Sequence, residues 1–225
     1  MRAANDPRGM MNAFRRRIAY SSRRRAVHAI CAAGTTLALA APSAQAEPAA
    51  RSALPCPDQT LEQPFLPWHD FAHYVLAPQG TFETLTAWHL SGAFRVRDNE
   101  TFYVHGNYEQ WSLALPPGSS ATSPAICVSV EHPVIRLFVR NAGSATSALR
   151  VEVLFKDISG ERRAAVIGEL VAGEMWAPTL QMPLLANGLA LTSDNKAMIA
   201  LRFTPLGLGG DWRIDDVYAD PYRKG

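Results

Sequence analysis

The residues of this chain that could do chemistry are few, and the most conspicuous are two adjacent aspartates near its end. Asp215 and Asp216 lie within Trp212–Tyr218, a stretch that alternates like a β-strand, in which Trp212, Ile214 and, after one irregular step, Val217 are expected to face a core. Unpaired charge beside a core costs free energy, so these carboxylates need a partner. Paired carboxylates can hydrolyse glycosidic bonds, but neighbours on a strand point to opposite faces unless a bulge intervenes. Catalysis by this pair is therefore disfavoured.

The remaining polar residues form no catalytic motif that we recognise. The sequence contains no Gly-x-Ser-x-Gly, no His-Glu-x-x-His and no phosphate-binding loop. His69 and His73 are four residues apart and would share one face of a helix, a spacing that can bind zinc. The prolines around them disfavour a helix, so we interpret both as surface or packing histidines. We therefore expect a protein that is not an enzyme.

The N-terminus and the cysteines indicate an exported protein. Residues 1–25 carry eight arginines and one acid, and an apolar run and the small residues Pro42–Ala46 follow. This order is typical of a secretory signal peptide, which we assign to residues 1–46, leaving no transmembrane segment. Cys56 and Cys127 then remain as an even pair in an oxidising compartment, which predicts a disulfide. We expect a secreted protein, periplasmic or extracellular.

The charge of the mature chain argues against a nucleic-acid partner. The full chain is +2, but residues 47–225 hold 14 Lys and Arg against 19 Asp and Glu, a net charge of −5. Because the arginine-rich stretch leaves with the signal peptide, no basic patch is apparent in the rest of the sequence that could bind phosphates.

The mature chain divides into three parts. Residues 47–53 form a polar leader that we expect to be disordered, and residues 54–79 combine closely spaced prolines with aromatic residues, which predicts an irregular segment wrapped around a core. Residues 80–225 contain short alternating runs between turn signals, a pattern typical of an antiparallel sandwich or barrel. The predicted strands are Thr81–Glu83, Trp88–Ser91, Phe94–Arg97, Phe102–His105, Ser112–Leu115, Ile126–Val130, Ile135–Arg140, Arg150–Phe155, Ala165–Leu170, Thr179–Met182, Ala197–Thr204 and Trp212–Tyr218.

Four landmarks in this region occur together in a known family. They are Gly80–Glu83 followed by Trp88, Ser112–Leu115, Leu149–Phe155 with Lys156–Gly160, and Trp212–Val217. They resemble the galactose-binding-like jelly rolls, particularly the secreted carbohydrate-binding modules associated with cellulases. This resemblance implies an all-β fold, an antiparallel two-sheet jelly-roll β-sandwich. The whole mature chain also resembles a group of secreted bacterial proteins that share Ile-Asp-Asp-Val-Tyr-x-Asp-Pro and bring no assigned activity.

The resemblance also implies a structural metal ion. In such modules the Glu of the opening motif and an Asp of the closing strand bind Ca²⁺, which here corresponds to Glu83 and Asp216, with Asp215 as the fallback. Calcium takes roughly six to eight oxygen ligands, so carboxylates and carbonyls of the first and last strands could share one ion. The alternative is that the acids are solvated and one of them pairs with Arg213 or Arg95.

Sugar recognition relies on aromatic faces and a few polar groups. Tyr103, His105, Tyr108 and Trp111 cluster in sequence around a polar loop and form our candidate binding patch. The alternative is that they are ordinary aromatics at strand edges.

Three functions are compatible with these observations. The first is a secreted non-catalytic protein that binds carbohydrate or a cell-surface glycan. The second is a structural or interaction protein of the cell envelope or extracellular space without a sugar ligand. A polysaccharide-active enzyme ranks third, because no catalytic motif is present.

Overall fold

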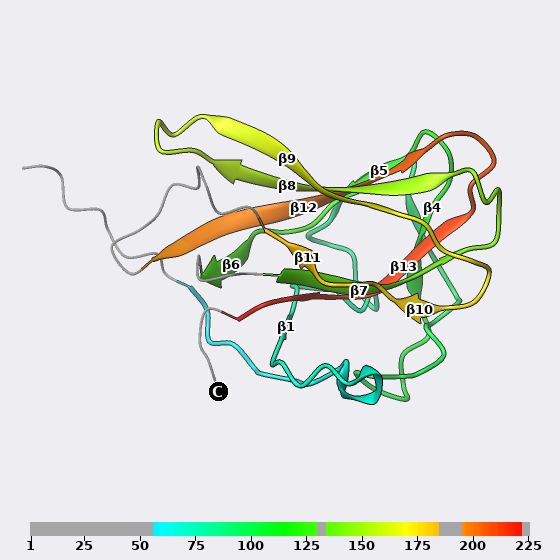
Figure 1. Ribbon diagram of the computed structural model, residues 1–225, viewed down its shortest axis with the longest axis horizontal. Helices are drawn as coiled ribbons and strands as arrows, with labels where there is room; N and C mark the ends of the chain where they lie inside the picture. The colour runs from blue at the N-terminus through cyan, green and yellow to red at the C-terminus, as the bar shows by residue number, and fades with distance from the viewer. Residues whose placement is uncertain (1–55, 130–133, 185–194, 222–225) are drawn as a thin grey trace, which may run out of the picture. The chain divides into compact units, whose positions relative to one another are not determined.

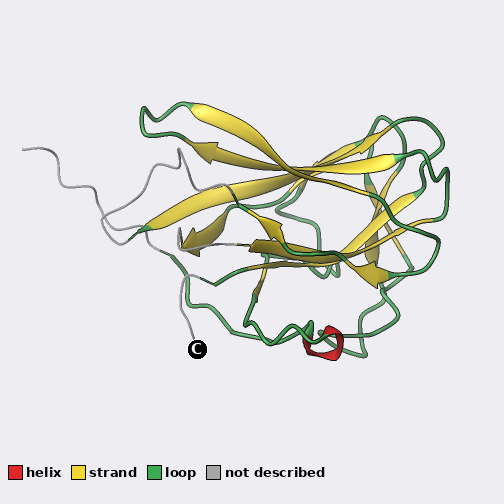
Figure 2. Ribbon diagram, viewed as in Figure 1, coloured by secondary structure: helices red, strands yellow, loops and turns green. Residues whose placement is uncertain are grey.

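A computed structural model describes residues 56–129, 134–184 and 195–221 of the chain. All of them belong to one compact unit, Glu47–Gly225. The predicted signal peptide, 1–46, and the leader, 47–53, lie outside the described residues. The described part is built of β-strands and one 3-10 turn, η1 (Leu66–Trp68), as Figures 1 and 2 show. The predicted all-β class is therefore confirmed.

The strands form two antiparallel sheets that lie one over the other. The first sheet has the order β10-β7-β13-β4-β3, with β1 beside β13 and β11 beside β7. Its strands are β1 (Val75–Leu76), β3 (Phe94–Val96), β4 (Ser112–Leu115), β7 (Val134–Asn141), β10 (Ala177–Pro178), β11 (Met182–Pro183) and β13 (Trp212–Ala219).

The second sheet has the order β2-β5-β12-β8-β9, with β6 beside β12. Its strands are β2 (His89–Ser91), β5 (Ser120–Thr122), β6 (Ile126–Ser129), β8 (Ala148–Lys156), β9 (Arg162–Leu170) and β12 (Lys196–Leu206). The chain passes repeatedly from one sheet to the other, as in a jelly roll. The predicted two-sheet sandwich is thus confirmed.

The core lies between the sheets and follows from alternation along the strands. On β12 the alternate residues Ala197, Ile199, Leu201 and Phe203 are buried, and their neighbours are more exposed. On β13 the predicted core residues Trp212, Ile214 and Val217 are fully buried. Burial of each such side chain contributes about 1.5–3 kcal/mol to folding, so these two strands hold the sheets together.

A bulge interrupts β13 where the sequence has its two aspartates. The register with β7 shifts between Asp215 and Tyr218, and Asp216 has a left-handed backbone with φ of 43°. Asparagine and aspartate tolerate this conformation better than most residues. The bulge cancels the alternation expected of a regular strand, so both aspartates and Val217 are buried.

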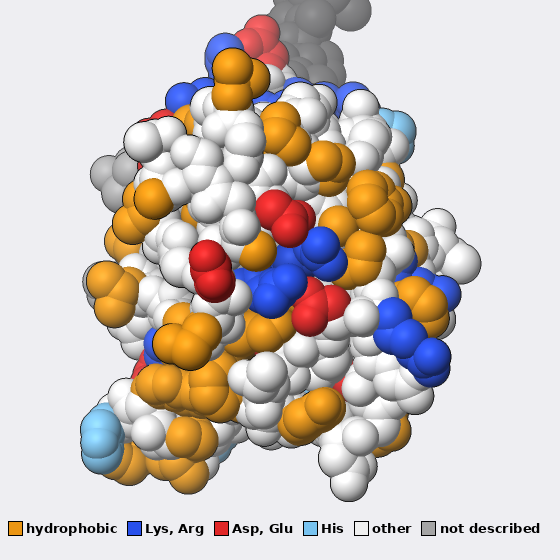
Figure 3. Space-filling model, turned by 90° about the vertical axis from the view of Figure 1, so that its right-hand side faces the viewer, with side chains coloured by type: hydrophobic (Ala, Val, Ile, Leu, Met, Phe, Trp, Pro, Cys, Tyr) orange, Lys and Arg blue, Asp and Glu red, His pale blue; other side chains and the backbone are white. Residues whose placement is uncertain are grey.

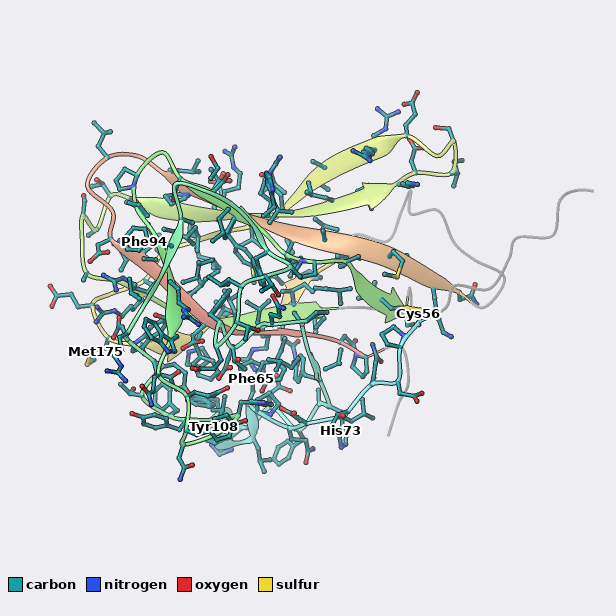
Figure 4. All side chains as sticks on the ribbon, turned by 180° about the vertical axis from the view of Figure 1, so that it is seen from behind. Cys56, Phe65, His73, Phe94, Tyr108 and Met175 are labelled. Carbon is teal, nitrogen blue, oxygen red and sulfur yellow. A yellow bond between two sulfur atoms is a disulfide. The ribbon has the colours of Figure 1, made fainter. Side chains whose placement is uncertain are left out.

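The irregular segment covers the outside of the first sheet, as predicted. Its aromatic side chains form a second, smaller core against β7 and β13. Figure 4 shows Cys56, His73 and Phe65 along the side of the unit that this segment covers. The buried members of this core are Phe65, Tyr74, Phe138, Trp176 and Tyr218.

A disulfide fastens the start of this segment. Cys56 is bonded to Cys127 of β6, with their Cα atoms 5.8 Å apart. The predicted disulfide is therefore present. Near its other end the segment contains β1, which pairs with β13. Gly80, the residue after the segment, lies so close to β13 that a Cβ would be 2.9 Å from the carbonyl oxygen of Val217.

Three predicted strands are wrong. Thr179–Met182 is mostly the connection between β10 and β11, in which the N–H of Thr179 donates to the carbonyl of Leu137. The other two are lost to local hydrogen bonding. Thr81–Glu83 forms a turn, in which the backbone N–H of Phe82 donates to the carbonyl of Gln79. The stretch Phe102–His105 is a loop because the carboxylate of Glu100 accepts the N–H groups of Phe102 and Val104. Side-chain acceptors that satisfy the backbone in this way compete with sheet pairing. Among the described residues, no helix is long and apolar enough to cross a membrane.

Candidate functional site

Asp215, the first aspartate of the bulge, has a structural role in the described part of the chain. One carboxylate oxygen accepts the backbone N–H of Glu100 at 3.0 Å, and the other accepts the N–H of Asp216 at 2.9 Å. Burial, together with the charge of Asp216, raises the pKa of Asp215 well above its usual range. This side chain therefore fixes the start of the loop that follows β3.

The carboxylate of Asp216 has no such partners. It is buried, and neither of its oxygens accepts a hydrogen bond from a described residue. Burial is the main cause that raises the pKa of Asp216 to about 8, and the charges of Glu109 and Glu100 add to it. A buried acceptor without a partner is costly, so this group calls for either a proton or a cation.

Glu109 is in the same situation, although sequence analysis did not single it out. It is buried, and in the described part of the chain neither oxygen accepts a hydrogen bond of ordinary geometry, although a weaker contact with the side chain of Thr81 lowers the pKa of Glu109 slightly. Burial raises the pKa of Glu109 to about 7, opposed by nearby His105 and assisted by Glu83 and Glu100. Asp216 and Glu109 thus form an acid pair, defined by their buried carboxylates without hydrogen-bond partners of ordinary geometry, and the charge of Glu109 raises the proton affinity of Asp216.

Glu83, which the family resemblance also predicts as a calcium ligand, makes hydrogen bonds with other parts of the chain. One of its carboxylate oxygens accepts the backbone N–H groups of Gln110 and Trp111, at 2.6 and 3.0 Å. Its carbonyl oxygen accepts a hydrogen bond from Arg95. Of the three predicted calcium ligands, only Asp216 therefore keeps both carboxylate oxygens unpartnered.

The donor set of the acid pair fits a hard divalent cation. No group of three His, Cys, Asp or Glu side chains suited to a metal occurs in the described ranges. The pair offers four oxygens from Asp216 and Glu109, and backbone carbonyls commonly complete the shell of calcium. Softer metals that prefer sulfur or imidazole have no matching donors in this pair.

The same shifts predict that the cation-free protein is most stable in mild acid. The pKa values of Asp216 and Glu109 are about 8 and about 7 in the folded state, whereas their ordinary values are 3.8 and 4.5. Between these limits the folded state binds more protons than the unfolded chain, so stability falls as the pH rises. In buffer with chelator, we expect Tm to fall by several degrees between about pH 5 and about pH 8. Glu109→Gln should flatten this decline, and a Tm that rises throughout the range would contradict the argument.

A groove opens between η1 and the residues that follow Glu100, in the same loop that contains Glu109. Its volume is about 610 Å³. Trp68 and Phe102 meet edge to face across 4.8 Å between ring centroids, and Phe102 is 45% exposed. Figure 3 shows hydrophobic side chains gathered at the lower left of the face it presents. The groove is lined by Gln63, Pro64, Leu66, Pro67, Trp68, Phe102 and Val104.

The four residues of the predicted aromatic patch each have their own contacts in the structure. His105 contacts the carboxylate of Glu62 at 3.3 Å, and the ring of Trp111 lies under the guanidinium of Arg95, 4.2 Å away. Tyr108 is exposed and its ring lies against Gly106. Tyr103 is half exposed, with φ of 51° between the groove residues Phe102 and Val104.

The histidines that could have formed a zinc pair do not share a helix. The 3-10 turn η1 ends at Trp68, and His69 has a left-handed backbone with φ of 61°. Both His69 and His73 are exposed. This agrees with our interpretation of them as surface residues.

Comparison with known proteins gives similarities at the level of structure. No family model matches the sequence, and no curated protein matches it. Among solved structures, the chain is similar to the carbohydrate-binding and catalytic modules of endo-1,4-β-D-xylanase 10B from Clostridium thermocellum. The identity is 21%, covering 65% of this chain and 28% of that one, with a TM-score of 0.45.

Two further similarities have the same extent in this chain. The C-terminal family 22 carbohydrate-binding module of the Clostridium thermocellum enzyme is 14% identical over 65% of this chain and 94% of that one, with a TM-score of 0.44. The enzymatically active domain of tailspike protein 4 from bacteriophage CBA120 is 17% identical over 64% of this chain, with a TM-score of 0.42. The match spans 21% of that domain. Carbohydrate-binding modules thus recur among the structures that this sandwich resembles.

Proposed function

We propose that this protein is an exported, non-catalytic binding protein that holds carbohydrate in the groove between η1 and the loop after β3. The observation that carries the proposal is the pair of aromatic rings, Trp68 and Phe102, at an open groove. Sugar rings pack their C–H faces against such rings, and flat aromatic side chains lose little conformational entropy in doing so. The sequence resemblance to carbohydrate-binding modules points to the same class of ligand.

The lining of the groove favours a neutral glycan. Of its residues only Gln63 has a polar side chain, and its amide nitrogen donates to the carbonyl of Phe71 at 2.7 Å. The amide oxygen of Gln63 could then accept a hydrogen bond from a sugar hydroxyl. No charged side chain lines the groove to bind a carboxylate or sulfate group. An apolar lining with one orienting polar group is typical of small-ligand sites.

Retardation in native gels that contain neutral polysaccharides tests this proposal. We expect Phe102→Ala to weaken binding by about tenfold, which corresponds to roughly 1.4 kcal/mol of lost stacking. Phe71→Ala is the matched control, because Phe71 is 67% exposed but does not line the groove. The melting curve of Phe71→Ala should stay close to that of the original chain, and Phe102→Ala should show a small loss of stability, because Phe102 also packs against Trp68 and Phe138.

Two outcomes would overturn the assignment of the groove. If Tyr108→Ala or Trp111→Ala abolishes retardation and Phe102→Ala does not, the ligand binds at the aromatic patch predicted from sequence. If no polysaccharide retards the protein, the glycan function fails and the interaction-protein alternative takes its place.

We further propose that a structural calcium ion binds between Asp216 and Glu109. The support is that four buried carboxylate oxygens of the described residues accept no hydrogen bond of ordinary geometry. When bound, the ion would neutralise two charges that otherwise repel one another inside the unit. Its role is stabilising, because neither residue lines the groove.

Asp216→Asn provides a sharp test of this ion. Asparagine keeps the shape and tolerates φ of 43°, but it removes one of the two repelling charges. In chelator we therefore expect Tm of the variant to equal or exceed that of the original chain at about pH 8. Added calcium should raise Tm of the original chain by several degrees and leave the variant unchanged. Asp211→Asn, at a half-exposed acid that pairs with Arg213, is the control, and elemental analysis that finds no calcium in the original chain would remove the proposal.

A further inference from the structure

The loop between β3 and β4, residues 98–111, carries two features at once. It contains Glu109, one half of the acid pair, and also Phe102 and Val104, which line the groove. A change in the position or mobility of this loop at the acid pair is therefore expected to change the position of the groove residues as well.

Acid side chains, rather than strand pairing, hold the backbone of this loop. At its start the N–H of Glu100 donates to Asp215. In its middle the carboxylate of Glu100 accepts the N–H groups of Phe102 and Val104. At its end Glu83 accepts the N–H groups of two consecutive residues, Gln110 and Trp111.

This mode of anchoring concentrates negative charge beneath the loop. Glu100 and Asp215 are buried together with the acid pair, and the charges of Glu109, Glu100, Glu62 and Glu83 all act on Asp216. Without a counter-ion, these carboxylates repel one another where the loop has to close. A divalent cation would bind the carboxylates of Asp216 on β13 and Glu109 in the loop, and so replace their repulsion with a shared attraction.

On its other side the loop forms one wall of the groove. Phe102 packs against Trp68, and also against Phe138 of β7 at 5.7 Å between ring centroids. The wall thus depends on where the loop places Phe102. The opposite wall belongs to η1, which is held by the smaller aromatic core, and Phe102 and Val104 touch the same core from the loop side.

We infer that a cation at Asp216 and Glu109 locks the 98–111 loop and so sets the shape of the groove. The inference rests on the proposed cation site, and it extends that site from a stabilising role to control of ligand binding. Coupling between two sites is reciprocal, so a ligand in the groove would also tighten the cation. An effect of about tenfold on either affinity is expected.

Hydrogen exchange of the mature protein, without any glycan, tests the lock directly. We expect calcium to slow the exchange of the Phe102 and Val104 amides by about tenfold or more relative to chelator. The hairpin around Asp157, which is held by its own bonds to Ser159 and Glu161, serves as the internal control and should not change. Glu109→Gln should remove the effect of calcium on the loop, and Asp216→Asn repeats the test if that variant does not fold.

Each result separates the lock from the proposals beneath it. If calcium binds in titration calorimetry but the two amides exchange at the same rate, the lock is overturned and the cation site stands. If calcium does not bind, the cation site and the lock both fail, whereas the groove can still be tested by gel retardation. If the loop is protected but a polysaccharide that binds the groove does so equally in calcium and in chelator, control of the groove is overturned.

Discussion

Replacing Asp70 with alanine should lower the free energy of unfolding by about 3–5 kcal/mol, one of the two largest effects that we expect of a change in this protein. The carboxylate of Asp70 lies between the wrapped segment and the first sheet. It accepts hydrogen bonds from Arg136 at 2.5 Å, from the hydroxyl of Tyr74 at 2.7 Å and from Gln181 at 3.2 Å. Arg136 is 6% exposed, so the variant would leave a buried cation without its counter-charge.

The cost is large because Arg136 cannot turn toward solvent. Its guanidinium lies 4.0 Å above the ring of Phe65, and two of its nitrogens donate to the carbonyl of Thr179. The contact therefore fastens η1 and its neighbours to β7. Since η1 supplies Trp68 to the groove, loss of the contact should also weaken binding of a glycan.

Urea unfolding of matched variants measures this effect. Glu169→Ala is the control, because Glu169 pairs with Arg150 where both side chains are well exposed, and exposed pairs contribute about 1 kcal/mol or less. The double variant Asp70→Ala/Arg136→Met should recover much of the loss, since it removes the unpaired cation as well. Equal losses of unfolding free energy in Asp70→Ala and Glu169→Ala would contradict a stabilising role of the contact between Asp70 and Arg136.

The parts of the fold that sequence predicted well are those where alternation decides burial. Trp212, Ile214 and Val217 were expected in the core and are fully buried. The irregular step in this pattern was visible in the sequence, and it corresponds to the bulge. The wrapped segment was also predictable, because prolines exclude regular structure while its aromatic residues require burial.

The candidate site was harder to predict, because its members meet through a loop that has no repeating pattern. Phe102–His105 alternates like a strand, but the carboxylate of Glu100 satisfies the backbone donors and curls the chain. That curl brings Glu109 near Asp216 and Phe102 against Trp68. Neither meeting leaves a local signal in the sequence. The resemblance supplied Asp216 and Glu83 as ligands, and nothing local in the sequence indicated that one carboxylate oxygen of Glu83 also holds the backbone of the loop.

Removal of the disulfide by Cys56→Ala/Cys127→Ala should lower the free energy of unfolding by about 4 kcal/mol in the chain-entropy model. The two cysteines are 71 residues apart, so the bond removes much of the freedom of the unfolded chain. Urea unfolding of the double variant measures the change. The unchanged protein in reductant is the control and should lose the same amount, because both lack only the cross-link.

The disulfide and the Asp70 contact act on the same segment by different physical routes. The bond between Cys56 and Cys127 restricts the unfolded state, whereas the carboxylate of Asp70 pairs with Arg136 in the folded state. Reduction should therefore cost stability but leave the groove formed, because Asp70 still fixes η1 against β7. A reduced protein that remains folded but no longer binds the polysaccharide would show that the cross-link itself shapes the groove, and that outcome would contradict this division of roles.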